Sequence, residues 1–210
     1  MADGCPFPKA WCNRRLDKGE HLYHQGDPVE GIHVLLSGLV AMERVDEDGQ
    51  FAILRIVEPG ALLPHSGLLG RELHNGSARA LTPVQACLVS TATVKAAIAD
   101  DPLLGLNLLQ RGCEELRRSE DAIFRLCCGD LSERVMGVLE MLAGQLGEGQ
   151  SDGDVALTLP ISWREVGAMV GSRSEVISRL LRRLSADRRL SFRGHRVVLH
   201  RARPAMRACG

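Results

Sequence analysis

The sequence has 210 residues, enough for one large or two small domains; it has no apolar run of about 18 residues and no signal peptide, which excludes a membrane-spanning helix and predicts a cytoplasmic protein. Its seven cysteines are an odd number, which in a reducing compartment excludes a disulfide framework and leaves metal, cluster or redox roles open. The net charge is zero, but residues 160–210 carry 12 basic and 3 acidic side chains, which leaves 14 basic and 23 acidic for residues 1–159.

The first element group covers residues 1–99 and has the pattern of a small β-roll. Short apolar runs such as "GIHVLLSGLVAMERV" and "FAILRIVEPG" alternate with turns that contain Gly and Asp-Gly. Such segments predict short antiparallel strands joined by hairpins. A second strand group, "SARALTPVQACLVS", follows an irregular loop over residues 64–76.

A long helix is predicted over residues 100–128, because the apolar spacing changes to three and four residues. Asp100, Asp101 and Pro102 provide a helix start. The spacing predicts either a coiled coil across a homodimer or a helix that lies on its own roll. The residues of this seam are Leu106, Leu109, Cys113, Leu116, Glu120, Ile123 and Cys127.

Residues 129–210 have the pattern of a winged helix-turn-helix. After an amphipathic helix in "LSERVMGVLEMLAGQL" and an exposed loop in "GEGQSDGD", the chain reads as strand, helix, tight turn near Gly171, helix and hairpin at Gly194-His195. The excess of basic residues in this part favours binding to a polyanion, although a basic segment can also serve solubility alone.

The second helix of this motif, within residues 172–188, divides into a buried and an outward face. Val176, Ile177, Leu180, Leu181 and Leu184 form the apolar stripe. Arginine can donate two hydrogen bonds to guanine, glutamate can accept one from cytosine, and further arginines can neutralise phosphates. The predicted DNA-binding residues are Arg173, Ser174, Glu175, Ser178, Arg179, Arg182 and Arg193.

Most of the chain, from about residue 17 to 200, resembles the Crp/Fnr transcription regulators. The similarity rests on "HQGDP", "GIHVLLSGLVAM", "DEDGQ" and "LRIVEPG" in the roll and on "GSRSEVISRLLRRL" in the helix. It implies an α+β fold with a cyclic-nucleotide-binding-type β-roll, a long dimerisation helix and a C-terminal winged helix-turn-helix. The E-x-x-S-R pattern of Glu175, Ser178 and Arg179 is similar to the Fnr branch. It implies a homodimer on palindromic DNA with TTGA(T/C) half-sites, and contact with RNA polymerase.

The resemblance does not extend to the cyclic AMP pocket. Where cyclic AMP-binding members carry a glutamate and an Arg-Ser pair, this sequence has His65 and, near the pair, His74-Asn75. Without the arginine, a cyclic phosphate would lose its charge-assisted hydrogen bonds, so cyclic AMP is not expected to bind unless Arg71 or Arg79 replaces it.

Several cysteines suggest an iron–sulfur cluster that senses oxygen or redox state. Cys87 aligns with the cluster-ligand cysteine of Fnr proteins, and Cys5 and Cys12 lie in an N-terminal arm, where those proteins keep their other ligands. Cys113 or a carboxylate such as Asp3 would complete the set of four. Cys87 can also be simply a small core residue.

Two other sensors stay open, and an enzyme is not expected. "PHSG" resembles the haem-binding segment of the carbon-monoxide sensor of this family, which makes His65 a candidate haem ligand. A thiol switch at Cys127-Cys128, or a regulator without an effector, is a further alternative. The sequence has no Gly-x-Ser-x-Gly, P-loop or Cys-x-x-Cys motif, which argues against an enzyme.

Overall fold

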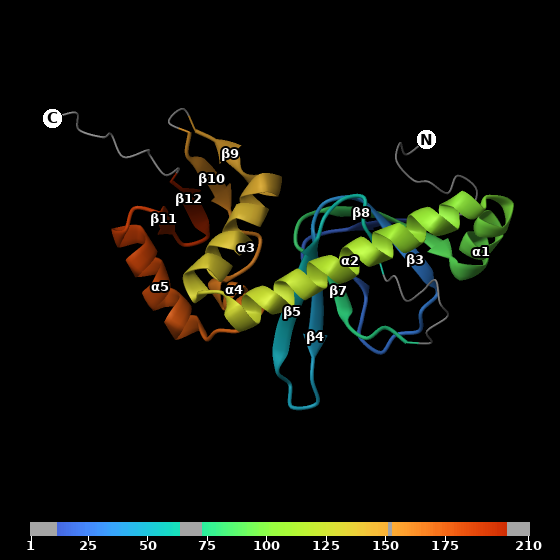
Figure 1. Ribbon diagram of the computed structural model, residues 1–210, viewed down its shortest axis with the longest axis horizontal. Helices are drawn as coiled ribbons and strands as arrows, with labels where there is room; N and C mark the ends of the chain where they lie inside the picture. Colours follow the sequence, from blue (N-terminus) through green and yellow to red (C-terminus); the bar gives the residue numbers. More distant parts are fainter. Residues whose placement is uncertain (1–11, 64–72, 151–152, 201–210) are drawn as a thin grey trace. The chain divides into compact units, whose positions relative to one another are not determined.

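The computed structural model describes residues 12–63, 73–150 and 153–200. The chain divides into two compact units, Met1–Ala122 and Ile123–Gly210. The first unit holds the roll and most of the long helix, and the second holds the helix-turn-helix (Figure 1). In the described part of the chain, no helix combines the length and the apolar character needed to cross a membrane.

The roll consists of two antiparallel four-stranded sheets, with strand orders β1-β8-β3-β6 and β2-β7-β4-β5. This confirms the predicted roll of short strands and hairpins. The strands are β1 (Cys12–Leu16), β2 (His21–Tyr23), β3 (Gly31–Ser37), β4 (Val40–Val45), β5 (Phe51–Val57), β6 (Leu62–Leu63), β7 (Ser77–Ala80) and β8 (Val84–Ser90).

Strands β3, β6 and β8 of the first sheet are apolar at successive positions and are buried on both faces over most of their length. Leu35 and Ala86 face the interior of the roll, whereas Val34 and Cys87 face outward. The outward cluster is covered by helix α1 (Thr91–Asp100) and by Leu108 of helix α2 (Pro102–Cys128). Continuous apolar strands of this kind occur where both faces of a sheet are covered.

Helix α1 is separate from the strands of the roll, a division that the sequence pattern over residues 1–99 does not predict. Its start has a local cause, because the Ser90 side chain at the N-cap accepts a hydrogen bond from the backbone N–H of Thr93. The chain then turns at Asp101, and Pro102 begins α2, two residues later than the predicted helix start.

The roll contacts one stripe of α2, and this stripe is not the predicted seam. Leu104 and Leu108 pack on the roll, and Glu115 forms an ion pair with Arg55 of β5. The Arg111 guanidinium donates a 2.8 Å hydrogen bond to the carbonyl of Gly60. The seam residues are exposed instead, including Leu106, Leu109, Leu116 and Ile123 at 60–64%. The alternative in which the seam lies on its own roll is therefore wrong.

The second unit confirms the predicted winged helix-turn-helix. It contains helices α3 (Leu131–Leu146), α4 (Trp163–Val170) and α5 (Ser174–Ala186). A four-stranded sheet in the order β11-β12-β10-β9 completes it, with β9 (Glu148–Gly149), β10 (Val155–Thr158), β11 (Leu190–Arg193) and β12 (Arg196–Leu199). The β11–β12 hairpin is the wing, and it turns at Gly194, whose φ is +61°.

Candidate nucleic-acid interface

Helix α4 and its turn set the position of α5. Ser162 and Glu165 form a reciprocal capping box at the start of α4, and Gly171 ends the helix in the left-handed conformation, with φ 67° and ψ 39°. A Cβ atom on Gly167 would lie 2.7 Å from the carbonyl oxygen of Ser172, so α4 and the turn approach closely there. This approach fixes where the N-terminus of α5 begins.

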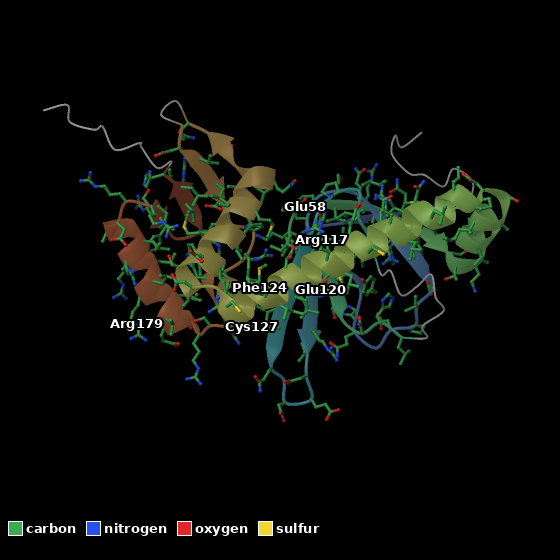
Figure 2. All side chains as sticks on the ribbon, viewed as in Figure 1. Glu58, Arg117, Glu120, Phe124, Cys127 and Arg179 are labelled. Carbon is green, nitrogen blue, oxygen red and sulfur yellow. The ribbon has the colours of Figure 1, made fainter. Side chains whose placement is uncertain are left out.

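The two faces of α5 are those that the sequence predicts. Ile177, Leu181 and Leu184 are buried, and Val176 and Leu180 are half-buried. The opposite face is exposed to solvent, and Figure 2 labels Arg179 on it. The exposed residues on this face and at the N-cap are Arg173, Ser174, Glu175, Ser178, Arg179, Arg182 and Arg183.

The positive charge of α5 is little neutralised within the unit. Among the described residues, the ion pair that we observe on this helix is Arg183–Asp187, at 3.8 Å between two exposed side chains. Exposed pairs of this kind contribute little and leave the cation accessible. Glu175 lies in the first turn, where the helix dipole favours an acidic side chain, so its presence there is also compatible with a purely structural role.

The N-terminus of α5 has no side-chain cap of its own. Arg173 occupies the N-cap in an extended conformation and makes no side-chain hydrogen bond to the first turn. Ser, Thr, Asp or Asn usually satisfies these N–H groups. An uncapped helix start next to a cationic side chain favours an anionic partner such as a DNA phosphate.

The wing is held against α4 by Trp163, a residue that the sequence pattern did not single out as a site residue. Its indole N–H donates a 2.9 Å hydrogen bond to the carbonyl of Gly194, and its ring meets Phe192 edge-on at 5.9 Å between centroids. Its place directly after the N-cap Ser162 is the feature of the sequence that could have drawn attention to it.

The wing also places Arg193 opposite Arg196 in the strand register. Like charges that face each other are unfavourable without a counter-anion, which phosphate would supply.

Two described residues were candidates for contact with a cyclic phosphate: His74 is buried, and Arg79 is paired with a carboxylate. His74 stacks on Tyr23, at 3.6 Å between ring centroids and 11° between planes, and is 6% exposed. Burial lowers the pKa of His74, while the nearby Asp27 raises it less, so the buried imidazole favours the neutral form. The Nε–H group of Arg79 donates a 2.6 Å hydrogen bond to the carboxylate of Glu43, which is buried. His65 and Arg71 lie outside the described residues.

The predicted cluster cysteines are only partly described. Cys87 is completely buried in the apolar cluster under α1 and α2. In the antiparallel pairing of β1 with β8, Cys87 lies opposite Asn13, and Cys12 lies opposite Leu88. Cys113 is exposed on α2, and Cys5 lies outside the described residues. Within residues 12–63, 73–150 and 153–200, no three His, Cys, Asp or Glu side chains are placed to hold a metal ion.

Two protein-family models match the chain. A cyclic nucleotide-binding domain matches residues 13–101, and a Crp-like helix-turn-helix domain matches residues 133–209. Both matches coincide with the two structural parts described above, the roll and the winged helix-turn-helix.

Curated relatives and solved structures agree with these matches. The global nitrogen regulator of Nostoc sp. is 24% identical over 191 residues, 89% of this chain and 84% of the relative. The CRP-like cAMP-activated global transcriptional regulator of Mycobacterium tuberculosis is 26% identical over 164 residues, 78% and 73% of the two chains. The structure of FixK2 from Bradyrhizobium japonicum superposes with a TM-score of 0.76 at 25% identity, covering 91% of this chain and 93% of FixK2.

Proposed function

Since the chain belongs to the Crp/Fnr family of transcription regulators, we propose that it binds palindromic DNA with Fnr-like TTGA(T/C) half-sites as a homodimer. The proteins it matches are regulators of transcription and not enzymes. The observation that carries the proposal is the exposed row of Glu175, Ser178 and Arg179 on the first turns of α5, the end that enters the major groove in this motif.

Each residue of this row has a defined partner on a base pair. The Arg179 guanidinium donates two hydrogen bonds to O6 and N7 of a guanine, and the Glu175 carboxylate accepts one from N4 of a cytosine. Ser178 donates to a base or a phosphate. Arg182 and the wing residue Arg193 neutralise phosphates and so contribute affinity for any sequence.

The exposed seam of α2 supports the homodimer. Its four large apolar side chains are 60–64% exposed in one copy, which is unfavourable in water. A second α2 packed in parallel would bury them knob into hole. Two α5 helices related by a two-fold axis would then meet half-sites about one helical turn apart, which explains why the proposed site is a palindrome.

A selection of bound duplexes from random DNA tests this proposal. We expect enrichment of an inverted repeat with TTGA in each half and a spacing of roughly one helical turn between half-site centres. Enrichment of a single half-site would contradict the dimer. Enrichment of an inverted repeat without TTGA would contradict the assigned contacts of α5.

For the signal, we propose a cysteine-bound iron–sulfur cluster that responds to oxygen or redox state, with Cys5, Cys12 and Cys87 as ligands. What supports a sensing role for Cys87 is its position, because its thiol packs in the same cluster as Leu108 of α2. A change at this sulfur would alter packing beneath the dimer helix. The described residues alone do not form a cluster site, so the proposal depends on Cys5.

Contact with RNA polymerase is proposed from the family resemblance.

Iron and sulfide analysis of protein prepared without oxygen tests the cluster. We expect both elements in the wild type and in Cys128→Ser, an exposed control, and their loss in Cys87→Ala, because a missing thiolate removes a ligand. Iron close to zero in the wild type would contradict the cluster. A Soret band that disappears in His65→Ala would favour the haem alternative.

Titration with cyclic AMP is expected to show no binding, since the stacked, buried His74 offers no guanidinium to bind the cyclic phosphate.

A further inference from the structure

We propose that Cys113 is a redox-sensitive cross-linking site, at which the thiols of two copies of this chain join in a disulfide across the dimer seam. The inference rests on the proposed homodimer and assigns Cys113 a role other than cluster ligation. It requires that the two thiols face each other and that the helices approach closely at this level.

The position of Cys113 in the seam makes the two thiols face each other. Cys113 is exposed and lies between Leu109 and Leu116, which are 64% and 60% exposed in one copy. It is seven residues after Leu106 and seven before Glu120, so these three residues share one heptad position. In a parallel two-helix coiled coil, the same heptad position of both helices meets across the axis. The partner subunit's Cys113 is therefore the residue that Cys113 faces.

A glycine beside the thiol indicates that the helices approach closely here. Gly112 lies in the middle of α2, where glycine costs about 0.5–1 kcal/mol relative to alanine. A Cβ atom at Gly112 would meet nothing within 4 Å in one copy, so packing within that copy does not require a glycine. Gly112 lies beside the seam, where a small residue lets a second helix come close.

The expected distance suits a disulfide. Packed helices lie about 8–10 Å apart between axes, and each Cα lies about 2.3 Å from its own axis, so Cα atoms on the line between the axes are roughly 3–5 Å apart, and those beside that line are farther apart. Disulfides usually join Cα atoms about 4.4–6.8 Å apart. The upper part of the range of axis separations therefore gives Cα distances that a disulfide can join.

The chemistry is thiol–disulfide exchange with a low-molecular-weight disulfide as the oxidant. One Cys113 thiolate attacks a sulfur of the oxidant, forming a mixed disulfide and releasing one small thiol. The partner subunit's Cys113 then attacks the protein sulfur of that mixed disulfide, forming the cross-link and releasing the second small thiol. Two protein thiols are oxidised and one small disulfide is reduced to two thiols, so the step balances.

A cross-link at Cys113 would compensate for weak association in the C-terminal part of the seam. Glu120 occupies the next equivalent position after Cys113, where two carboxylates would face each other and oppose association. Figure 2 shows Glu120 with Phe124 and Cys127 toward the end of α2. A covalent link at Cys113 would hold the dimer together at concentrations at which the reduced chains dissociate. Oxidation would thereby keep the two DNA-reading helices paired.

Oxidised glutathione added to the purified full chain tests the inference, followed by a non-reducing gel and tryptic peptide mapping. The peptide of residues 112–117 contains Cys113 as its single cysteine, whereas Cys127 and Cys128 share the peptide of residues 126–134. We expect a covalent dimer in which two copies of the first peptide are joined. We expect the cross-link to be lost in Cys113→Ser and retained in Cys128→Ser, the control at an exposed position off the seam.

Light scattering in reductant separates this inference from the proposed function. A non-covalent dimer without a link between the two peptides of residues 112–117 would overturn the cross-linking site alone. A link found only between the peptides of residues 126–134 would overturn it as well. A monomer in reductant at micromolar concentration would overturn the proposed homodimer. Gly112→Ala gives a second readout, because we expect slower cross-linking than in Gly144→Ala, a glycine of α3 that also has open space.

Discussion

Leu116→Glu is expected to convert the protein to a monomer that no longer holds a palindromic site. Leu116 lies at the centre of the exposed seam and is 60% exposed in one copy. Fully burying a Leu stabilises by roughly 1.5–3 kcal/mol, and the dimer covers at most the exposed 60% of two copies, so the loss is about 2–4 kcal/mol before charge repulsion is added. This corresponds to a dimer that is about 30-fold to several hundredfold weaker.

Sedimentation velocity at several concentrations measures the dissociation constant of the dimer. Binding of each variant to DNA that carries a full palindrome or a single half-site is then compared. Leu54→Glu is the matched control, because Leu54 is exposed to a similar extent, at 58%, but belongs to strand β5 and not to α2. We expect Leu54→Glu to stay dimeric. Equal dimerisation of both variants would show that α2 does not form the interface through this seam.

Arg179→Ala is expected to weaken binding to the proposed palindrome and to remove discrimination at one base pair of each half-site. A bidentate contact from arginine to guanine contributes about 1–3 kcal/mol of discrimination. The palindrome contains the contact twice, so the full site loses about 2–6 kcal/mol, whereas random DNA loses only the charge contribution. The side chain is exposed, so we expect no loss of folding stability.

Arg193→Ala is the control for the DNA contacts, since Arg193 lies on the wing and is assigned to phosphate. Its loss should weaken specific and random duplexes alike and reduce the dependence of the logarithm of affinity on the logarithm of salt concentration by about one unit. Fluorescence anisotropy at several salt concentrations compares the variants. If Arg179→Ala weakened specific and random DNA to the same extent, α5 would not read bases through this residue.

Much of the molecule is encoded in local patterns that the sequence displays directly. The spacing of three and four residues in α2 predicts which residues share one face of that helix, and the apolar stripe of α5 predicts its buried face, because helical periodicity determines which residues share a face. Gly171 predicts the turn between α4 and α5, since glycine readily adopts its left-handed conformation. The exposed residues of α5, to which we assign the proposed DNA contacts, follow from the same periodicity.

The tertiary structure decided what covers each face, because a pattern along the chain does not name its distant neighbour. An apolar seam on α2 fits a second chain or the chain's own roll, and the packing of Leu108 with the ion pair of Glu115 and Arg55 assigns the roll to a different stripe. Cys87 belongs to a strand that is apolar on both faces, so alternation alone leaves its side undetermined. The partner of Trp163 lies 31 residues away at Gly194, a hydrogen bond that only the folded chain brings together.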